Sequence, residues 1–162
     1  MDNPSDSLAS ALDAAIRILT RRNHSRHEMA RKLRQRRFTK AVIDAAIARC
    51  EQLGYMDDAE TAAGYFRELI RKGMGGERIR FEMNKKGLSG DTVERLLEAY
   101  AGGPDETAAA CGLLTRRMAS FERESDPQKR REKIFRFMYS RGFSADITIE
   151  ALQKNVEKTP SG

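Results

Sequence analysis

The feature that most constrains this chain is an internal repeat. When the sequence is shifted by 50 residues, similar residues coincide without a gap from Ile16 to Ile47. A third copy follows the second at a shift of 45 in its first part. Ten inserted residues raise that shift to 55 in the rest. Because self-similarity at a fixed period is typical of stacked supersecondary units, the sequence predicts three copies of one unit.

Each copy has the pattern of three helices. In the first copy, apolar residues recur at spacings of three and four from Leu8 to Leu19, which defines one face of a helix. Ser25 and Glu28 form a capping box that opens a second helix. A third helix follows Thr39, which is a suitable N-cap residue, and it ends near Gly54.

The start of the third helix recurs in all three copies as an apolar residue followed by a hydroxyl residue. The three pairs are Phe38-Thr39, Leu88-Ser89 and Phe143-Ser144. We interpret them as structural: loss of an N-cap at Thr39 would cost about 0.5–2 kcal/mol. Loss of the Phe38 ring would cost about 3 kcal/mol if the ring is fully buried. Gly87 and Gly142 stand where the second helix of their copies must end.

The fold class predicted from these patterns is all-α, with three tandem three-helix repeats that form an elongated, curved helical array. No alternating strand pattern of useful length is present. The predicted boundaries are a disordered N-terminal tail at 1–7, repeats at 8–56, 57–103 and 104–157, and a disordered C-terminal tail at 158–162.

Basic residues concentrate on the first and second helices of each copy. The chain has 30 Lys and Arg against 24 Asp and Glu, a net charge of +6, and residues 21–37 alone hold eight basic residues and one acidic residue. Repeated in each copy, these basic residues would form a stripe along one side of the array, which favours a polyanionic or acidic partner. The alternative is that these side chains complement helix dipoles and solvate helix faces. The candidate filament- or DNA-binding residues are Arg21, Arg22, Arg26, Arg31, Lys32, Arg36, Arg37, Arg71, Lys72, Arg78, Lys85, Lys86, Arg116, Arg117, Lys129, Arg130 and Arg141.

Patterns of catalytic, metal and cofactor sites are missing from the sequence. His24 and His27 lack the Cys or carboxylate partners of a zinc site, and we interpret them as exposed loop residues. Residues 73–76 are glycine-rich, but no strand precedes them and no Gly-Lys-Ser/Thr follows. Asp57-Asp58 fits a helix N-cap better than a Mg²⁺ site. We therefore expect no enzyme, no metal and no cofactor.

Cysteine usage and hydropathy indicate the compartment. Cys50 and Cys111 are too few for a disulfide framework and fit small buried apolar residues, so a reducing environment is expected. No stretch approaches the roughly 18 apolar residues that cross a bilayer, and the polar start does not resemble a signal peptide. We expect a cytoplasmic protein without membrane contact.

The order and spacing of several motifs resemble the RecX regulatory proteins. Ala14–Arg22, Ser25–Met29 and Leu33 look like the first repeat of that family, and Leu53–Asp58 is similar to the junction that follows it. One departure is Thr61, where the family usually has an aromatic residue. The further matching positions are Gly75, Ile79, Glu82, Met83, Lys86 and Gly87 in the second repeat, and Asp126-Pro127, Lys129-Arg130, Phe137 and Arg141–Phe143 in the third.

The resemblance implies a non-enzymatic modulator of the RecA recombinase. Such a protein lies along the groove of the RecA–DNA filament and usually inhibits strand exchange, ATP hydrolysis and co-protease activity. The implied partners are the RecA filament and DNA, reached through the filament or directly, and the protein is expected to be a monomer. The main alternative is a stand-alone basic helical nucleic-acid-binding protein. A helical adaptor that binds only protein would leave the charge of the stripe unexplained.

Solution scattering tests the predicted elongation. A compact globule of 162 residues would have a radius of gyration of about 15 Å. We expect a clearly larger value, because repeats that contact mainly their neighbours form extended arrays. A value at or below that of the compact globule, or substantial strand content in circular dichroism, would contradict the repeat interpretation.

Overall fold

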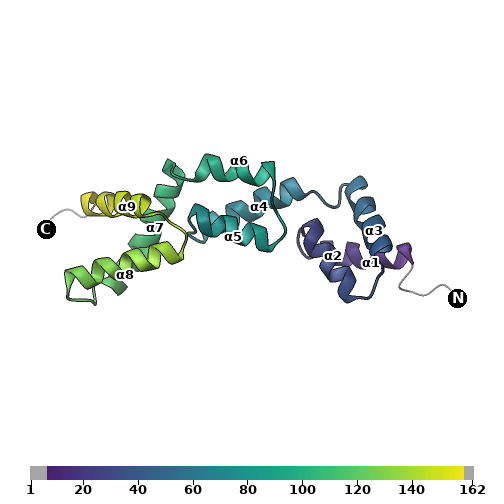
Figure 1. Cartoon of the computed structure of the whole chain (residues 1–162), viewed down its shortest axis with the longest axis horizontal. Coiled ribbons are helices and arrows are strands. Elements are labelled where there is room, and N and C mark those ends of the chain that lie inside the picture. The colour runs from purple at the N-terminus through teal and green to yellow at the C-terminus, as the bar shows by residue number, and fades with distance from the viewer. Residues whose placement is uncertain (1–6, 159–162) are drawn as a thin grey trace. The chain divides into compact units, whose positions relative to one another are not determined.

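The computed structural model of the chain describes residues 7–158, which contain nine α-helices and no strand (Figure 1). The prediction of an all-α fold is confirmed; elongation and curvature stay predictions. The predicted tails lie outside the described residues, except that Ser7 is the N-cap of the first helix and Lys158 ends the last. The helices are α1 (Leu8–Leu19), α2 (Arg26–Gln35), α3 (Lys40–Gln52), α4 (Asp58–Arg71), α5 (Gly76–Lys85), α6 (Asp91–Tyr100), α7 (Pro104–Phe121), α8 (Pro127–Ser140) and α9 (Ala145–Lys158).

The chain divides into two compact units. One comprises the chain up to Gly64 together with Met83–Thr92, and the other comprises Tyr65–Glu82 and the chain from Val93 onward. The first unit contains α1, α2 and α3, and the second contains α7, α8 and α9. The helices α4, α5 and α6 each contribute residues to both units. The predicted repeat boundaries at 56/57 and 103/104 stay predictions.

Equivalent positions of the repeat form the cores of the two units. In the first unit, α3 packs against α1 and α2, and Met29 and Leu33 are fully buried between them. In the second unit, α7 packs against α9 and α8. The equivalents of Met29 and Leu33 there are Ile134 and Met138, which are also buried. The repeat spacing therefore identified the core-facing positions of the second helix correctly.

The predicted starts of the third helices are correct in two copies of three. The helices α3 and α9 begin directly after Thr39 and Ser144, but α6 begins at Asp91 instead of after Ser89. Gly90 is equivalent to Lys40 of the first copy, but its φ of +89° is not helical, so α6 begins one residue later than α3 does. The alignment of the repeats contains no inserted residue here and therefore did not reveal the later start.

The structure meets neither condition on which the energies expected at Thr39 and Phe38 depend, a capping hydrogen bond and full burial of the ring. Thr39 occupies the N-cap position of α3, but its side chain accepts no hydrogen bond there. In the third copy, the Ile147 N–H does donate to Oγ of Ser144 at 3.2 Å. The ring of Phe38 is half-buried at the edge of the first core, so its removal costs less than that of a fully buried ring.

The N-terminus of α2 is a point of contact with residues of the next copy. Ser25 and Glu28 form the predicted capping box. The backbone N–H of Arg26 donates to Oδ1 of Asp58 at 2.9 Å, and Asp58 lies in the first turn of α4. Oγ of Ser25 donates to the carbonyl oxygen of Lys86, directly after α5, at 2.5 Å. Two segments of the second copy thus form hydrogen bonds with the start of α2.

The N-terminus of α5 makes the same two kinds of contact within the second unit. The backbone N–H of Gly76 donates to Oε1 of Glu106 in the first turn of α7 at 2.7 Å. The N–H of Gly75 donates to the carbonyl oxygen of Arg141, directly after α8, at 2.8 Å. The starts of α2 and α5 therefore make equivalent contacts with the copy that follows them. Each bonds a carboxylate from the first helix of that copy and a backbone carbonyl from the turn after its second helix.

The N-terminus of α8 is capped by its own sequence. Asp126 accepts hydrogen bonds from the N–H groups of Gln128 at 2.9 Å and Lys129 at 3.4 Å. Pro127 is the first residue of the helix and has no N–H to satisfy. The predicted Asp-Pro start is confirmed, and α8 takes its capping carboxylate from within its own copy.

The turn after each second helix has a left-handed residue at the equivalent position. This residue is Arg37, Gly87 or Gly142, with φ of 66°, 68° and 86°. A Cβ atom at Gly87 would lie 2.2 Å from Cβ of His27, and one at Gly142 would lie 2.3 Å from the backbone nitrogen of Arg78. Glycine is therefore required where the turn packs on another second helix, whereas the exposed Arg37 carries a side chain.

Replacing Gly87 by Ala measures this close approach. We expect a loss of about 2–5 kcal/mol in the free energy of unfolding, from left-handed strain together with overpacking against His27. The matched control is Gly54→Ala, because Gly54 has φ of 73° and nothing within 4 Å of the added methyl group. The control should lose only about 1–2 kcal/mol. Equal losses in urea unfolding would show that the contact with His27 contributes nothing.

Candidate nucleic-acid interface

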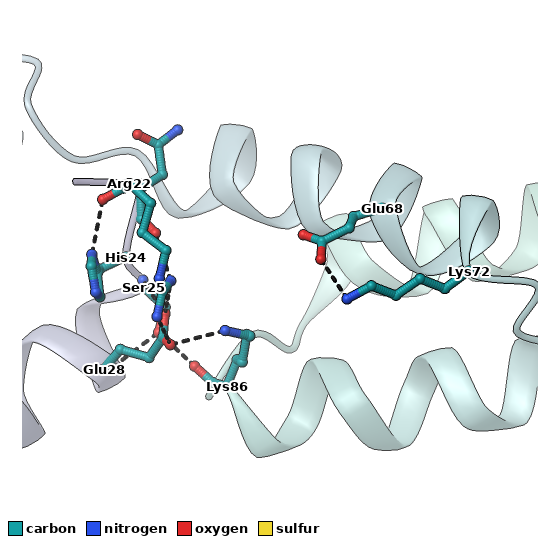
Figure 2. Close-up of polar contacts among 8 residues, drawn as sticks. Arg22, His24, Ser25, Glu28, Glu68, Lys72 and Lys86 are labelled. Atoms are coloured by element: carbon teal, nitrogen blue, oxygen red, sulfur yellow. Dashed lines mark hydrogen bonds and ion pairs between the residues drawn. The ribbon is translucent and has the colours of Figure 1, made fainter. Parts of the chain in front are cut away.

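The structure separates the two members of the first predicted basic pair. The Arg21 side chain is exposed and has no hydrogen-bond or ion-pair partner among the described residues. Arg22 instead binds the carboxylate of Glu28 with both terminal nitrogens, at 2.9 and 3.4 Å (Figure 2). Only Arg21 of this pair is therefore available for a partner without breaking an internal contact.

The carboxylate of Glu28 is almost completely buried, with a side chain that is 6% exposed. It also accepts hydrogen bonds from Nζ of Lys86 at 3.1 Å and from the backbone N–H of Ser25 at 3.2 Å (Figure 2). Burial by itself raises the pKa of this carboxyl, but the bonds from Arg22, Ser25 and Lys86 outweigh it and lower the pKa to about 2. Lys86, a predicted binding residue, thus neutralises a buried charge.

His24 lies in the same region, and the prediction that both histidines are exposed is wrong for it. Its side chain is buried, and Nδ1 lies 2.9 Å from the carbonyl oxygen of Arg22 (Figure 2). This burial lowers the pKa of the imidazole below its usual value. His27 is exposed, as predicted.

The other two pairs divide in the same way. Arg71 and Arg116 are exposed and, like Arg21, have no hydrogen-bond or ion-pair partner in the part of the chain that the structure describes. Lys72 forms an ion pair with Glu68 at 2.6 Å (Figure 2), and the guanidinium of Arg117 lies 5.4 Å from the centre of the Phe137 ring. The first member of every pair is thus the available cation.

Two predicted residues of the second unit, Arg116 and Arg141, lie close to Gly73. Nε of Arg141 donates to the carbonyl oxygen of Gly73 at 3.4 Å, and its Nη2 donates to that of Lys72. A methyl group at Gly73 would lie 3.3 Å from Nη2 of Arg116. Arg116 of α7 and Arg141 in the turn after α8 are thus brought to the turn that directly follows Arg71 and Lys72 in the sequence.

A second group of cations lies on α2 and the turn after it. Residues 31–37 contain five basic side chains, of which four are exposed and Lys32 is half-buried. None of them has a carboxylate partner among the described residues, and the guanidinium of Arg36 bonds the carbonyl oxygen of Lys32. We call this group the α2 segment: Arg31, Lys32, Arg34, Arg36 and Arg37.

Other predicted residues hold internal contacts. Arg26 pairs with Glu51, and Arg78 pairs with Glu82 at 2.8 Å. The half-buried Arg130 donates twice to the carbonyl oxygen of Glu124, at 3.0 and 2.8 Å. Lys85 and Lys129 are exposed. Further exposed arginines, which the predicted set did not include, are Arg17, Arg34, Arg49, Arg67, Arg95, Arg123, Arg131 and Arg136.

The structure also bears on the sequence predictions about metal sites, membrane spans, cysteines and Asp57. Among residues 7–158, no group of three or more His, Cys, Asp or Glu side chains is arranged to hold a metal ion. No described helix is both long and apolar enough to cross a membrane. Cys50 is fully buried as predicted, but Cys111 is half-buried, and its thiol lies 3.8 Å from the carbonyl oxygen of Ala151. Asp57 is a helix cap, as predicted, since Oδ1 accepts from the Ala59 N–H at 2.8 Å.

Comparison with known proteins identifies the repeat unit. Family models of the first, second and third three-helix domains of RecX match residues 11–50, 57–97 and 104–152, in that order. The chain belongs to the RecX family. The resemblance noted in the sequence is thereby confirmed, and each matched range lies within one of the three predicted copies.

Named RecX proteins are similar to the chain over almost its whole length. "Regulatory protein RecX" of Chlorobium phaeobacteroides is 34% identical over 89% of this chain and 92% of its own. The protein of that name from Vibrio parahaemolyticus is 34% identical over 88% and 90%. The crystal structure of RecX from Lactobacillus salivarius shares the fold with a TM-score of 0.79 at 21% identity, over 93% of this chain and 97% of that one.

Replacing Glu28 by Gln tests the internal role of Arg22 and Lys86. A pKa lowered from 4.5 to about 2 corresponds to roughly 3 kcal/mol of stability. Because the folded pKa is the lower one, this contribution is present above pH 4.5 and is lost as the pH falls toward 2. We therefore expect the difference in urea midpoint between the native chain and Glu28→Gln to be constant from about pH 7 to 5 and to shrink below.

The matched control is Glu94→Gln, which removes an ion pair with Arg80 at the surface. It should change the midpoint much less, because solvent screens exposed pairs. A Glu28→Gln variant as stable as this control at neutral pH would contradict the role assigned to the buried network.

Proposed function

We propose that this RecX-family protein binds the RecA–DNA filament and modulates it, chiefly by inhibiting recombinase, ATPase and co-protease activities. Membership of a family whose relatives are named regulatory proteins supports a regulatory role over a catalytic one. In the cell we place it in the cytoplasm, as a monomer that contacts DNA within the filament.

The observation that carries the proposal is that an available arginine recurs at the same position of each repeat. Arg21, Arg71 and Arg116 occupy equivalent positions and are exposed without an internal partner among the described residues. Helix dipoles recur in every copy as well, but Arg116 lies five residues before the end of α7 at Phe121, so complementing a helix dipole does not account for all three arginines. A partner with a regularly repeated phosphate or acidic surface would require this recurrence.

A stand-alone basic nucleic-acid-binding protein is the second candidate. The α2 segment favours it, since five basic residues within residues 31–37 without a carboxylate partner among the described residues suit contact with a phosphate backbone. Binding measured in parallel to RecA–DNA filaments, RecA alone and naked DNA at one salt concentration separates the two. The filament proposal expects the filament to bind most tightly, whereas equal affinity for naked DNA and filament would favour the second candidate.

Single substitutions within one pair test which cations contact the filament. We expect Arg21→Ala to weaken filament binding and to flatten its salt dependence by roughly 0.7–0.9 for each phosphate interaction that it removes, with little change in the urea midpoint. The adjacent Arg22→Ala is the matched control. It should lower the midpoint, because it leaves the buried Glu28 carboxylate with one cation fewer.

The same measurement on Arg71→Ala and Arg116→Ala extends the test to the other repeats. A combination of two such variants should bind more weakly than either alone, because the two arginines belong to different repeats. Unchanged affinity and salt slope in all three single variants would contradict the proposed use of these cations and leave the helix-dipole interpretation.

A further inference from the structure

Two aromatic side chains that the proposed function does not use are exposed on the second unit. Tyr139, near the end of α8, is 81% exposed, and Phe81 of α5 is 53% exposed. Both border one groove of ≈ 670 Å³, whose wall also includes the backbone around Gly142 and the buried Phe143. A single exposed apolar residue is common on protein surfaces, but rings gathered at one groove form the kind of patch that marks a binding site.

A second hollow adjoins the first. It has a volume of ≈ 290 Å³ and shares Tyr139, Phe143 and Ala145 with the larger groove. Phe135 and Arg136 of α8 also line it. Because Tyr139 lines both hollows and is mostly open to solvent, its ring offers π surface to each of them.

Arginine side chains lie beside these rings. The guanidinium of Arg78 lies 5.2 Å from the centre of the Phe81 ring, and that of Arg131 lies 5.0 Å from the centre of the Phe135 ring. Arg136 lines the smaller hollow beside Tyr139. Glu77 is the one acidic residue of the two linings, and α8 itself carries five basic residues and one acidic residue. Since Arg78 itself pairs with Glu82, Arg131 and Arg136 are the arginines beside the rings that have no carboxylate partner among the described residues.

We propose that this aromatic groove, formed by Phe81, Tyr139 and Phe143, binds unstacked bases of single-stranded DNA. Exposed aromatic faces stack on any base, while neighbouring arginines hold the phosphates that flank it. An anionic chain that also carries planar groups matches both features of the groove, whereas an apolar peptide matches only the rings. The inference deepens the proposed function, on which it rests, by naming the state of the DNA that this protein contacts.

Indole fluorescence reports stacking at this position directly. The chain has no Trp, so a Tyr139→Trp variant carries a single indole. We expect oligothymidylate to quench its emission, because a base stacks on the ring. The matched control is Tyr55→Trp in the first unit, where Tyr55 is 52% exposed and lines neither hollow. Quenching of neither variant, or of both to the same extent, would overturn the inference.

Affinity measurements separate stacking from charge. Tyr139→Leu should weaken binding of oligothymidylate about tenfold, as expected when one base no longer stacks, while Tyr139→Phe stays within about twofold of the native chain. The salt slope should not change, since the substitution removes no cation. An abasic oligonucleotide of the same length should bind the native chain and Tyr139→Leu equally.

The outcomes also distinguish this inference from the filament proposal. Unchanged oligothymidylate binding by Tyr139→Leu overturns the stacking inference. If that variant loses affinity for RecA alone instead, the groove is a protein contact and the inference is again overturned. In both cases filament binding through the cations remains testable, because it is measured with RecA present and with the arginine variants. Unfolding midpoints of the Tyr139 variants should match the native chain, since the ring adds little to the core.

Discussion

The starts of α2 and α5 are the constraint on which the arrangement of consecutive copies depends. A helix N-terminus presents unsatisfied N–H groups and a partial positive charge, which a buried contact must satisfy. Asp58 of the next copy supplies the carboxylate for α2, and Glu106 supplies it for α5. The carbonyl groups of Lys86 and Arg141 complete the contacts. These bonds join each helix start to two segments of the neighbouring copy.

This constraint explains why residues at equivalent positions do not share one role. The capping box places the Glu28 carboxylate inside the first unit, where a buried charge must be paired. Arg22 and Lys86 supply that pairing, so their charges are neutralised internally. The second copy has Arg78 in place of Glu28, and Lys72 pairs with a surface carboxylate instead. The first member of each basic pair is not needed for internal pairing, and it is therefore the cation open to a partner.

Much of the fold followed from the spacing of apolar residues. Positions such as Met29 and Leu33 recur in every copy because burial of the second helix requires an apolar side chain there, whatever the neighbouring loops do. Loops carried weaker signals. The predicted start of α6 was one residue too early, since Gly90 is left-handed where the equivalent Lys40 is helical, and this difference leaves the apolar periodicity on either side unchanged. His24 is polar and lies in a basic loop, and nothing in its sequence neighbours indicated that the loop is packed.

By itself, the sequence determined the class of fold, the threefold repeat, the family and the set of cations from which an interface can be built. These properties follow from periodicity and composition, which local sequence carries directly. Only the tertiary structure decided which cations are available and that Phe81 and Tyr139 border one groove. Those facts depend on residues that are distant along the chain: Glu28 lies 58 positions from Lys86, and Phe81 also lies 58 positions from Tyr139. Sequence spacing cannot encode such contacts, because the packing of one copy on the next creates them.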